Sequence, residues 1–118
     1  MLCYRINSSV NSDTATFYTP PYTPSACNGF KNDGVMIAAA SNELWGNGAA
    51  CGNNYKVKCL SGTNAGVPHP CKDNTDVVVT IVDFCSPGCQ GTLDLSQEAF
   101  AKIADRNEGK INIDFQQV

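Results

Sequence analysis

Short segments in which apolar and polar residues alternate recur along this chain, separated by turn-forming residues. The clearest is 111–117, where Ile111, Ile113 and Phe115 alternate with polar residues. This is the pattern of a strand with one buried and one solvated face. Comparable strand signals fall at 15–19, 35–40, 55–60 and 77–84. The pattern therefore predicts a mostly β protein.

One helix is predicted to begin just after Ser96, whose side chain suits an N-cap. Leu95 and Phe100 are spaced as a hydrophobic staple, and Ala99, Phe100 and Ile103 form an apolar stripe. We therefore expect this helix to pack one face on the core.

A second, shorter helical turn is predicted at 42–45, ended by Gly46. Prolines at 20, 21 and 24 exclude regular structure from the segment after the first strand, and 61–66 is typical of a loop. We therefore expect one or two short helices in the whole chain.

Length and charge narrow the class of protein. The chain has 118 residues, 42% of them hydrophobic, which suits one domain with one core. The net charge is −3 and the basic residues are scattered, so we expect no nucleic-acid partner. No apolar run approaches the ~18 residues of a membrane span, so we also expect none.

Seven cysteines in so short a chain indicate structural disulfides and an oxidising compartment, and hence a secreted, extracellular protein. Metal binding is the rival interpretation. It is disfavoured because Cys27, Cys51, Cys59 and Cys71 stand singly and His69 is the only histidine. We therefore expect no metal and no cofactor, and we expect His69, between two prolines, to be an exposed loop residue.

Cys3 is the odd cysteine. It lies in 1–12, which we expect to be a disordered tail preceding a domain at 13–118, because the segment has neither the apolar core nor the cleavage site of a secretory signal. The remaining six cysteines permit 15 pairings. Cys85 and Cys89 could form either a structural bridge or a redox pair, and their spacing, which is not C-x-x-C, favours the bridge.

Two aspartates are candidates for chemistry. Asp83 shares strand parity with Val77, Val79 and Ile81, so it should point inward near the strand end. It would belong either to a site or to a hydrogen-bonded loop contact. Asp94 precedes the predicted helix N-cap by two residues, where the helix N-terminus would favour the ionised carboxylate. Alternatively, Asp94 has only a structural role as a turn residue or through helix-end electrostatics.

Polar and aromatic side chains could complete such a site. Thr16 and Tyr18 lie on one face of the first predicted strand, either in a groove or in core packing with satisfied hydroxyls. Tyr22, Trp45 and Tyr55 could stack on sugar rings or simply pack in the core or at its rim.

Several of these segments, at 16–22, 47–52, 79–85 and 93–96 with the helix after them, resemble the plant natriuretic peptide proteins. That family belongs to the expansin-like group, whose domain is similar to family 45 endoglucanases, with barwin a more distant relative. The resemblance covers 13–118. It implies a six-stranded double-psi β-barrel, secretion to the plant apoplast, and a role in water and ion homeostasis or stress signalling.

The resemblance also assigns roles to residues. Hydrolases of this superfamily carry Thr-x-Tyr-x-Asp in the first strand, with the Asp as general base. Thr16 and Tyr18 match, Asp94 matches the general acid and Asp83 an acidic residue at a strand end, but Pro20 stands at the base. Proline cannot activate water. We therefore expect a groove of these four matching residues with a vestigial acid, Asp94, and no catalytic activity.

The same resemblance implies a disulfide pairing. The expected bridges are Cys27–Cys51, Cys59–Cys71 and Cys85–Cys89, which leaves Cys3 free.

Three hypotheses for function follow. The first is a non-lytic signalling protein perceived by a cell-surface receptor through the exposed region 35–64. The second is a cell-wall polysaccharide-binding or wall-loosening module that uses the groove, although expansins carry a second, sugar-binding domain that this chain, ending at Val118, is expected to lack. The third is weak glycan cleavage, by lytic-transglycosylase-like chemistry that needs only one acid or with another base such as Asp33. We expect a monomer in each case.

Overall fold

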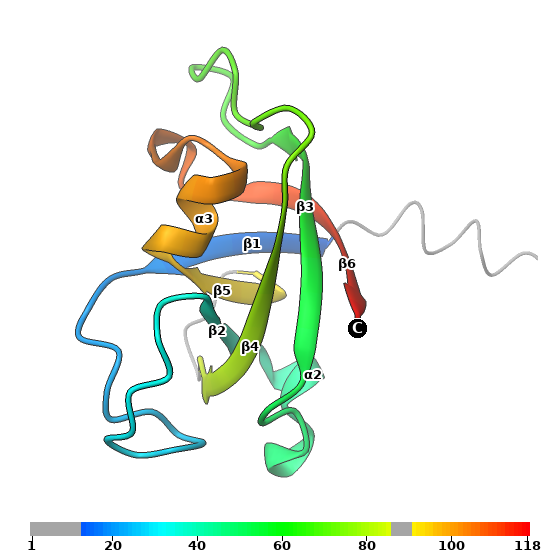
Figure 1. Ribbon diagram of the computed structural model, residues 1–118. Helices are drawn as coiled ribbons and strands as arrows, with labels where there is room; N and C mark the ends of the chain where they lie inside the picture. Colours follow the sequence, from blue (N-terminus) through cyan, green and yellow to red (C-terminus); the bar gives the residue numbers. More distant parts are fainter. Residues whose placement is uncertain (1–12, 86–90) are drawn as a thin grey trace, which may run out of the picture.

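A computed structural model of the protein describes residues 13–85 and 91–118. Six strands close into a barrel in the order β1-β5-β2-β4-β3-β6 (Figure 1). Their bounds are Asp13–Tyr18 (β1), Ile37–Ala40 (β2), Asn54–Gly62 (β3), Asp76–Phe84 (β4), Leu93–Ser96 (β5) and Ile111–Gln117 (β6). Two neighbouring pairs, β1–β5 and β2–β4, are parallel, and the other four are antiparallel. The six-stranded barrel expected from the resemblance is confirmed.

Five of the strands correspond to the predicted strand segments, and β5 does not. Only four residues long, β5 passes directly into the helix α3 (Gln97–Ile103). Leu93 and Leu95 are fully buried while Asp94 between them is only partly buried. Two apolar positions are too few for a periodic signal, so the residue pattern predicts no strand here.

The helix α3 forms as predicted and covers the barrel core. Ala99 donates its backbone N–H to Ser96 Oγ at 3.0 Å, the N-cap bond that is typically worth ~1 kcal/mol. Phe100 and Ile103 are fully buried, and the Phe100 ring packs 4.9 Å from that of Phe17. The apolar stripe therefore joins the helix to the barrel.

The shorter helical turn is also present. It spans Asn42–Trp45 (α2) and ends at Gly46, whose φ of 56° is left-handed, the conformation that glycine adopts at least cost. Two 3₁₀ turns, Gly46–Gly48 (η1) and Arg106–Glu108 (η2), complete the regular structure of the described segments. No helix among them is long and apolar enough to cross a bilayer.

Two predicted disulfides are confirmed. Cys27–Cys51 ties the loop after β1 to the turn after α2, and Cys59–Cys71 ties β3 to the loop that follows it. Each closes a loop of the unfolded chain and so lowers its entropy.

Only one cysteine of the third predicted bridge lies within the described residues. Cys85 takes part in a disulfide, but Cys89, like Cys3 and the rest of 1–12, lies outside the described residues. The pairing of Cys85 with Cys89, the free Cys3 and the N-terminal tail therefore stay predictions.

Candidate functional site

Strand register places four residues in one row across the barrel. Thr16 of β1 pairs with Asp94 of β5, Asp94 pairs with Ala39 of β2, and Ala39 pairs with Asp83 of β4. The positions next to this row on β5 and β2 belong to the core. Because side chains alternate between the faces of a strand, the row faces outward, and the two aspartates share one surface.

The prediction that Asp83 points inward is wrong, and a β-bulge is the reason. Ala38 pairs with Ile81 but Ala39 pairs with Asp83, so Val82 has no partner in this ladder. One extra residue reverses the parity of everything after it. The carbonyl of Val82 instead accepts the N–H of Cys27 at 2.9 Å, so the loop after β1 uses the backbone group that the bulge frees.

Asp83 is held by backbone amides on this outer face. Its Oδ1 accepts the N–H of Ala26 at 3.0 Å and that of Phe84 at 2.9 Å. The interpretation of Asp83 as a carboxylate bonded to loop amides is therefore confirmed. After burial, the charge of Asp83 is the next cause that raises the pKa of Tyr18.

Asp94 is partly buried beside Thr16, whose hydroxyl donates to Asp94 Oδ1 at 2.9 Å. Burial raises the pKa of Asp94, and the bond from Thr16 lowers it by less, so the net shift is upward. The helix N-terminus, expected to favour the ionised carboxylate, does not set the direction of this shift, because Asp94 lies within β5, where desolvation dominates. A raised pKa suits a group that holds a proton or donates a hydrogen bond to a ligand.

Tyr18 presents a buried polar atom to this site. Within the described part of the chain, its hydroxyl has no hydrogen-bond partner. Burial is the main cause that raises the pKa of Tyr18, followed by the nearby charges of Asp83 and Asp94. The ring of Tyr22 meets that of Tyr18 edge-on, with centroids 5.2 Å apart. An unsatisfied hydroxyl beside two carboxylates is a group that a ligand can satisfy.

Glu98 belongs to the same surface and was missed by the sequence reasoning. Tyr22 donates its hydroxyl hydrogen to Glu98 Oε1 at 2.5 Å. Burial and this bond raise the pKa of Tyr22 to about 12, and the bond lowers the pKa of Glu98. Tyr22 and Glu98 are 76 residues apart, so no local pattern in the sequence could have linked them.

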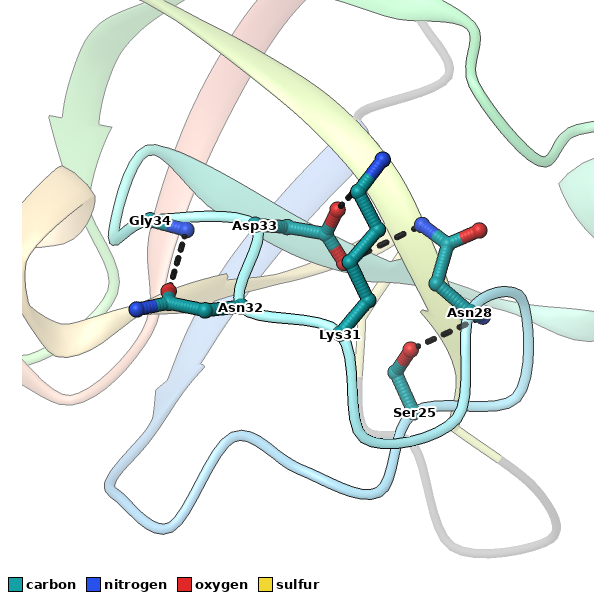
Figure 2. A network of polar contacts seen from close by, with 6 residues as sticks. All are labelled: Ser25, Asn28, Lys31, Asn32, Asp33 and Gly34. Atoms are coloured by element: carbon teal, nitrogen blue, oxygen red, sulfur yellow. Dashed lines mark hydrogen bonds and ion pairs between the residues drawn. The ribbon is translucent and has the colours of Figure 1, made fainter.

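Two positions are considered for a base that activates water, Pro20 and Asp33. Pro20 is exposed, and Asp33, the alternative base, is engaged within its own loop. Asp33 accepts a hydrogen bond from Asn28 Nδ2 at 3.0 Å and lies 4.0 Å from Lys31 Nζ; Figure 2 shows both contacts. Asp33 lines a hollow of about 330 Å³ whose lining does not include Asp94. Its contacts therefore indicate a loop-structuring role.

The remaining candidate residues have mostly structural surroundings. Trp45 stacks on Phe84 at 4.8 Å and 8°, and Tyr55 is buried against Phe115, so packing accounts for both aromatics. His69 is exposed in a loop, as predicted. Across residues 13–85 and 91–118, no group of three or more acidic, histidine or cysteine side chains is arranged to hold a metal ion.

A family model described as "Lytic transglycolase" matches residues 37–115 of this chain, and the family is that of the double-psi β-barrel. An EG45-like domain containing protein of Citrus jambhiri is 64% identical over 104 residues, which cover 88% of this chain and 79% of that protein. The putative EG45-like domain containing protein 1 of Arabidopsis thaliana is 56% identical over 101 residues, covering 86% and 78%.

Expansins are similar over part of their length. Expansin-A32 of Oryza sativa subsp. japonica is 33% identical over 99 residues, or 72% of this chain and 35% of that protein. A mutant Clavibacter michiganensis expansin, solved in complex with cellohexaose, superposes with a TM-score of 0.64 at 27% identity over 91% of this chain. The chain spans about half of that expansin, 49%. The family model's description names an enzyme class, but these relatives agree with the expectation that this chain is not an enzyme.

Proposed function

Because this chain belongs to the EG45-like domain proteins, within the expansin-related double-psi β-barrel group, we propose that it binds a neutral cell-wall glycan without cutting it. The binding surface is the groove, defined as Thr16, Tyr18, Asp83 and Asp94. We further propose that the protein works outside the cell, as a monomer. The disulfides support an oxidising compartment.

The observation that carries this proposal is the row of polar groups around the buried Tyr18 hydroxyl. A sugar presents many hydroxyls, each of which both donates and accepts hydrogen bonds. One of them could satisfy Tyr18 while its neighbours donate to Asp83 and Asp94. Leaving a buried hydroxyl unpaired costs ~1–3 kcal/mol, so a ligand that pairs it gains affinity. The cellohexaose bound by the Clavibacter expansin makes a β-1,4-glucan the first ligand to test.

Asp94 alone does not support hydrolysis. An inverting hydrolase places its two carboxyl groups ~6.5–9.5 Å apart so that one protonates the leaving group and the other activates water. Asp94 could supply the proton, but Pro20 occupies the position that matches the base. General acid assistance by itself contributes ~10²–10⁴-fold, far below what glycoside hydrolysis requires. Asp83, the other carboxylate of the groove, is bonded to two backbone amides, so the groove is suited to binding rather than turnover.

The test is titration calorimetry with cellohexaose, xyloglucan oligosaccharides and chitin oligosaccharides. Tyr18→Phe and Asp94→Asn should each weaken binding several-fold, because each alters one polar contact to the sugar. Asp114→Asn is the matched control, since Asp114 is an exposed carboxylate on β6 and its loss changes the net charge equally. No reducing sugar should be released. The proposal would be refuted by turnover that disappears in Asp94→Asn, or by glycan binding that is unchanged in both Tyr18→Phe and Asp94→Asn.

A second candidate function is extracellular signalling of the natriuretic type, with effects on water and ion balance under stress. Its support is the region 35–64, in which Val35 and Leu60 are 43% and 56% exposed, because exposed apolar side chains favour protein contacts. A change in protoplast volume on adding the protein, abolished by Leu60→Ser but not by Tyr18→Phe, would support a receptor at this region. No volume response at all would exclude it.

A further inference from the structure

We propose that a second hollow, separate from the groove, binds the carboxylate-bearing sugar of an acidic polysaccharide. This cationic hollow lies between the end of α3 and the loop joining β3 to β4. Its floor includes Phe17 and Ala104, and its rim includes His69, Lys72 and Arg106. The volume is about 530 Å³, within the ~300–1,000 Å³ of small-molecule sites. The proposal is independent of the groove.

The walls of this hollow are fixed to one another. Lys72 donates its backbone N–H to Ile103 O, and Asp105 donates its own to Pro70 O, each at 2.8 Å. Between these two bonds Cys71 forms a β-bridge with Ala104, and Cys71 is also bonded to Cys59 of β3. Figure 1 places the loop between β3 and β4 at the same end of the barrel as α3. The positions that carry the cations therefore need little ordering when a ligand binds.

The charges at the rim favour an anion. Lys72 Nζ donates to the carbonyl of Ala101, and Arg106 donates to Gln97 Oε1 at 2.9 Å. Both partners are neutral, so neither cation is neutralised by its bond and each keeps further N–H donors. Asp105 is the one acidic residue of the lining, and its Oδ1 already accepts the N–H of Asn107. Lys72 and Arg106 outnumber Asp105, so the lining carries a net positive charge in a chain of net charge −3; Glu98, whose pKa the charge of Arg106 helps to lower, lies outside the lining.

The apolar floor distinguishes a uronic acid from a simple anion. A pyranose ring has C–H faces that pack on an aromatic or aliphatic surface, here Phe17 and Ala104, while its carboxylate pairs with guanidinium or ammonium groups. Inorganic phosphate could use only the rim. A short oligogalacturonate therefore matches both parts of the site.

The experiment is calorimetric titration of trigalacturonate at low ionic strength, with thermal melts to verify folding. Lys72→Gln and Arg106→Gln should each weaken binding about tenfold, the effect expected on losing one charge-assisted contact. Lys102→Gln is the matched control, because Lys102 lies exposed on α3 outside the lining and its substitution removes the same charge. The affinity of Lys102→Gln for trigalacturonate should stay within about twofold of that of the unmodified protein.

Three results would overturn the inference. They are absence of trigalacturonate binding, equal weakening by Lys102→Gln, and inorganic phosphate that binds as tightly as trigalacturonate. The second would mean that net charge alone acts, and the third that the hollow is a simple anion site. Titration of cellohexaose into Lys72→Gln distinguishes the two proposals. If cellohexaose binds this variant as tightly as the unmodified protein, the groove does not depend on Lys72. If cellohexaose binds neither protein, only the proposal for the groove fails.

Discussion

Glu108 offers the sharpest test of how this fold is held together. It is 5% exposed at the end of η2, and its Oε2 accepts the backbone N–H groups of Thr63 and Asn64, the latter at 2.5 Å. Its Oε1 is buried with no hydrogen-bond partner in the described part of the chain. One carboxylate therefore fixes the start of the loop between β3 and β4. We expect Glu108→Ala to destabilise the protein clearly.

The magnitude follows from the two bonds. A hydrogen bond to a charged group contributes ~1.5–3 kcal/mol. Thr63 and Asn64 are exposed, so water can take over their amides, and each bond falls at the lower end of that range. The sum is about 3 kcal/mol for Glu108→Ala. Glu108→Gln keeps one carbonyl oxygen and loses the charge, and about half that cost is expected.

The assay is denaturant unfolding under non-reducing conditions, followed by circular dichroism. A loss of about 3 kcal/mol should also lower the melting temperature by roughly 10 °C in a domain of this size. Glu43→Gln, at an exposed position in α2, is the control and should change stability by less than ~0.5 kcal/mol. A loss below ~1 kcal/mol for Glu108→Ala would mean that the buried carboxylate contributes little beyond its own desolvation cost.

Three further predictions follow. Replacing both Cys27 and Cys51 by serine opens a bridge of sequence separation 24 and should cost about 3 kcal/mol in the chain-entropy model; an unchanged denaturation midpoint would contradict this. Asp94 holds its proton more tightly in the folded than in the unfolded protein, so its contribution to stability is present below the unfolded pKa and is lost as pH rises through the folded pKa. Asp94→Asn should therefore raise the melting temperature at pH 7 more than at pH 3, whereas an equal change at both would disprove the linkage. Gly62→Ala would place a Cβ 2.6 Å from Glu108 Oε2 and 2.9 Å from Pro70 Cβ, a clash expected to cost ~1–3 kcal/mol. A double-mutant cycle with Glu108→Ala should recover part of that loss, and strict additivity would rule out the contact.

Strand and helix positions were largely predictable because they depend on local patterns. The alternation at 111–117 corresponds to β6, and the Ser96 N-cap with its apolar stripe corresponds to α3. β5 was missed because a four-residue strand carries no period. Glu108 was also missed, because a charged residue in a turn is ordinarily exposed.

The candidate site was predictable only in part. The alternation of β4 placed Asp83 on the wrong face, since a bulge at Val82 leaves no signature in the residue pattern. The helix dipole suggested an ionised Asp94, whereas burial has the larger effect. Thr16 and Asp94 came together through the resemblance alone, because residues 78 positions apart have no local relation. Distant pairings and desolvation are set by the closed barrel, and no window of the sequence contains them.

The parallel pairing of β1 with β5 has a consequence for how the protein folds. β1 opens the domain and its partner residues in β5 lie 78 positions further along the chain, so this contact has a large loop-closure cost. A fragment that lacks either strand cannot assemble Thr16 beside Asp94, whatever local structure it keeps. With the proposed function, the moment during refolding at which the protein regains affinity for a glycan would mark the closure of the barrel. Glycan binding would then report formation of the native topology rather than of secondary structure.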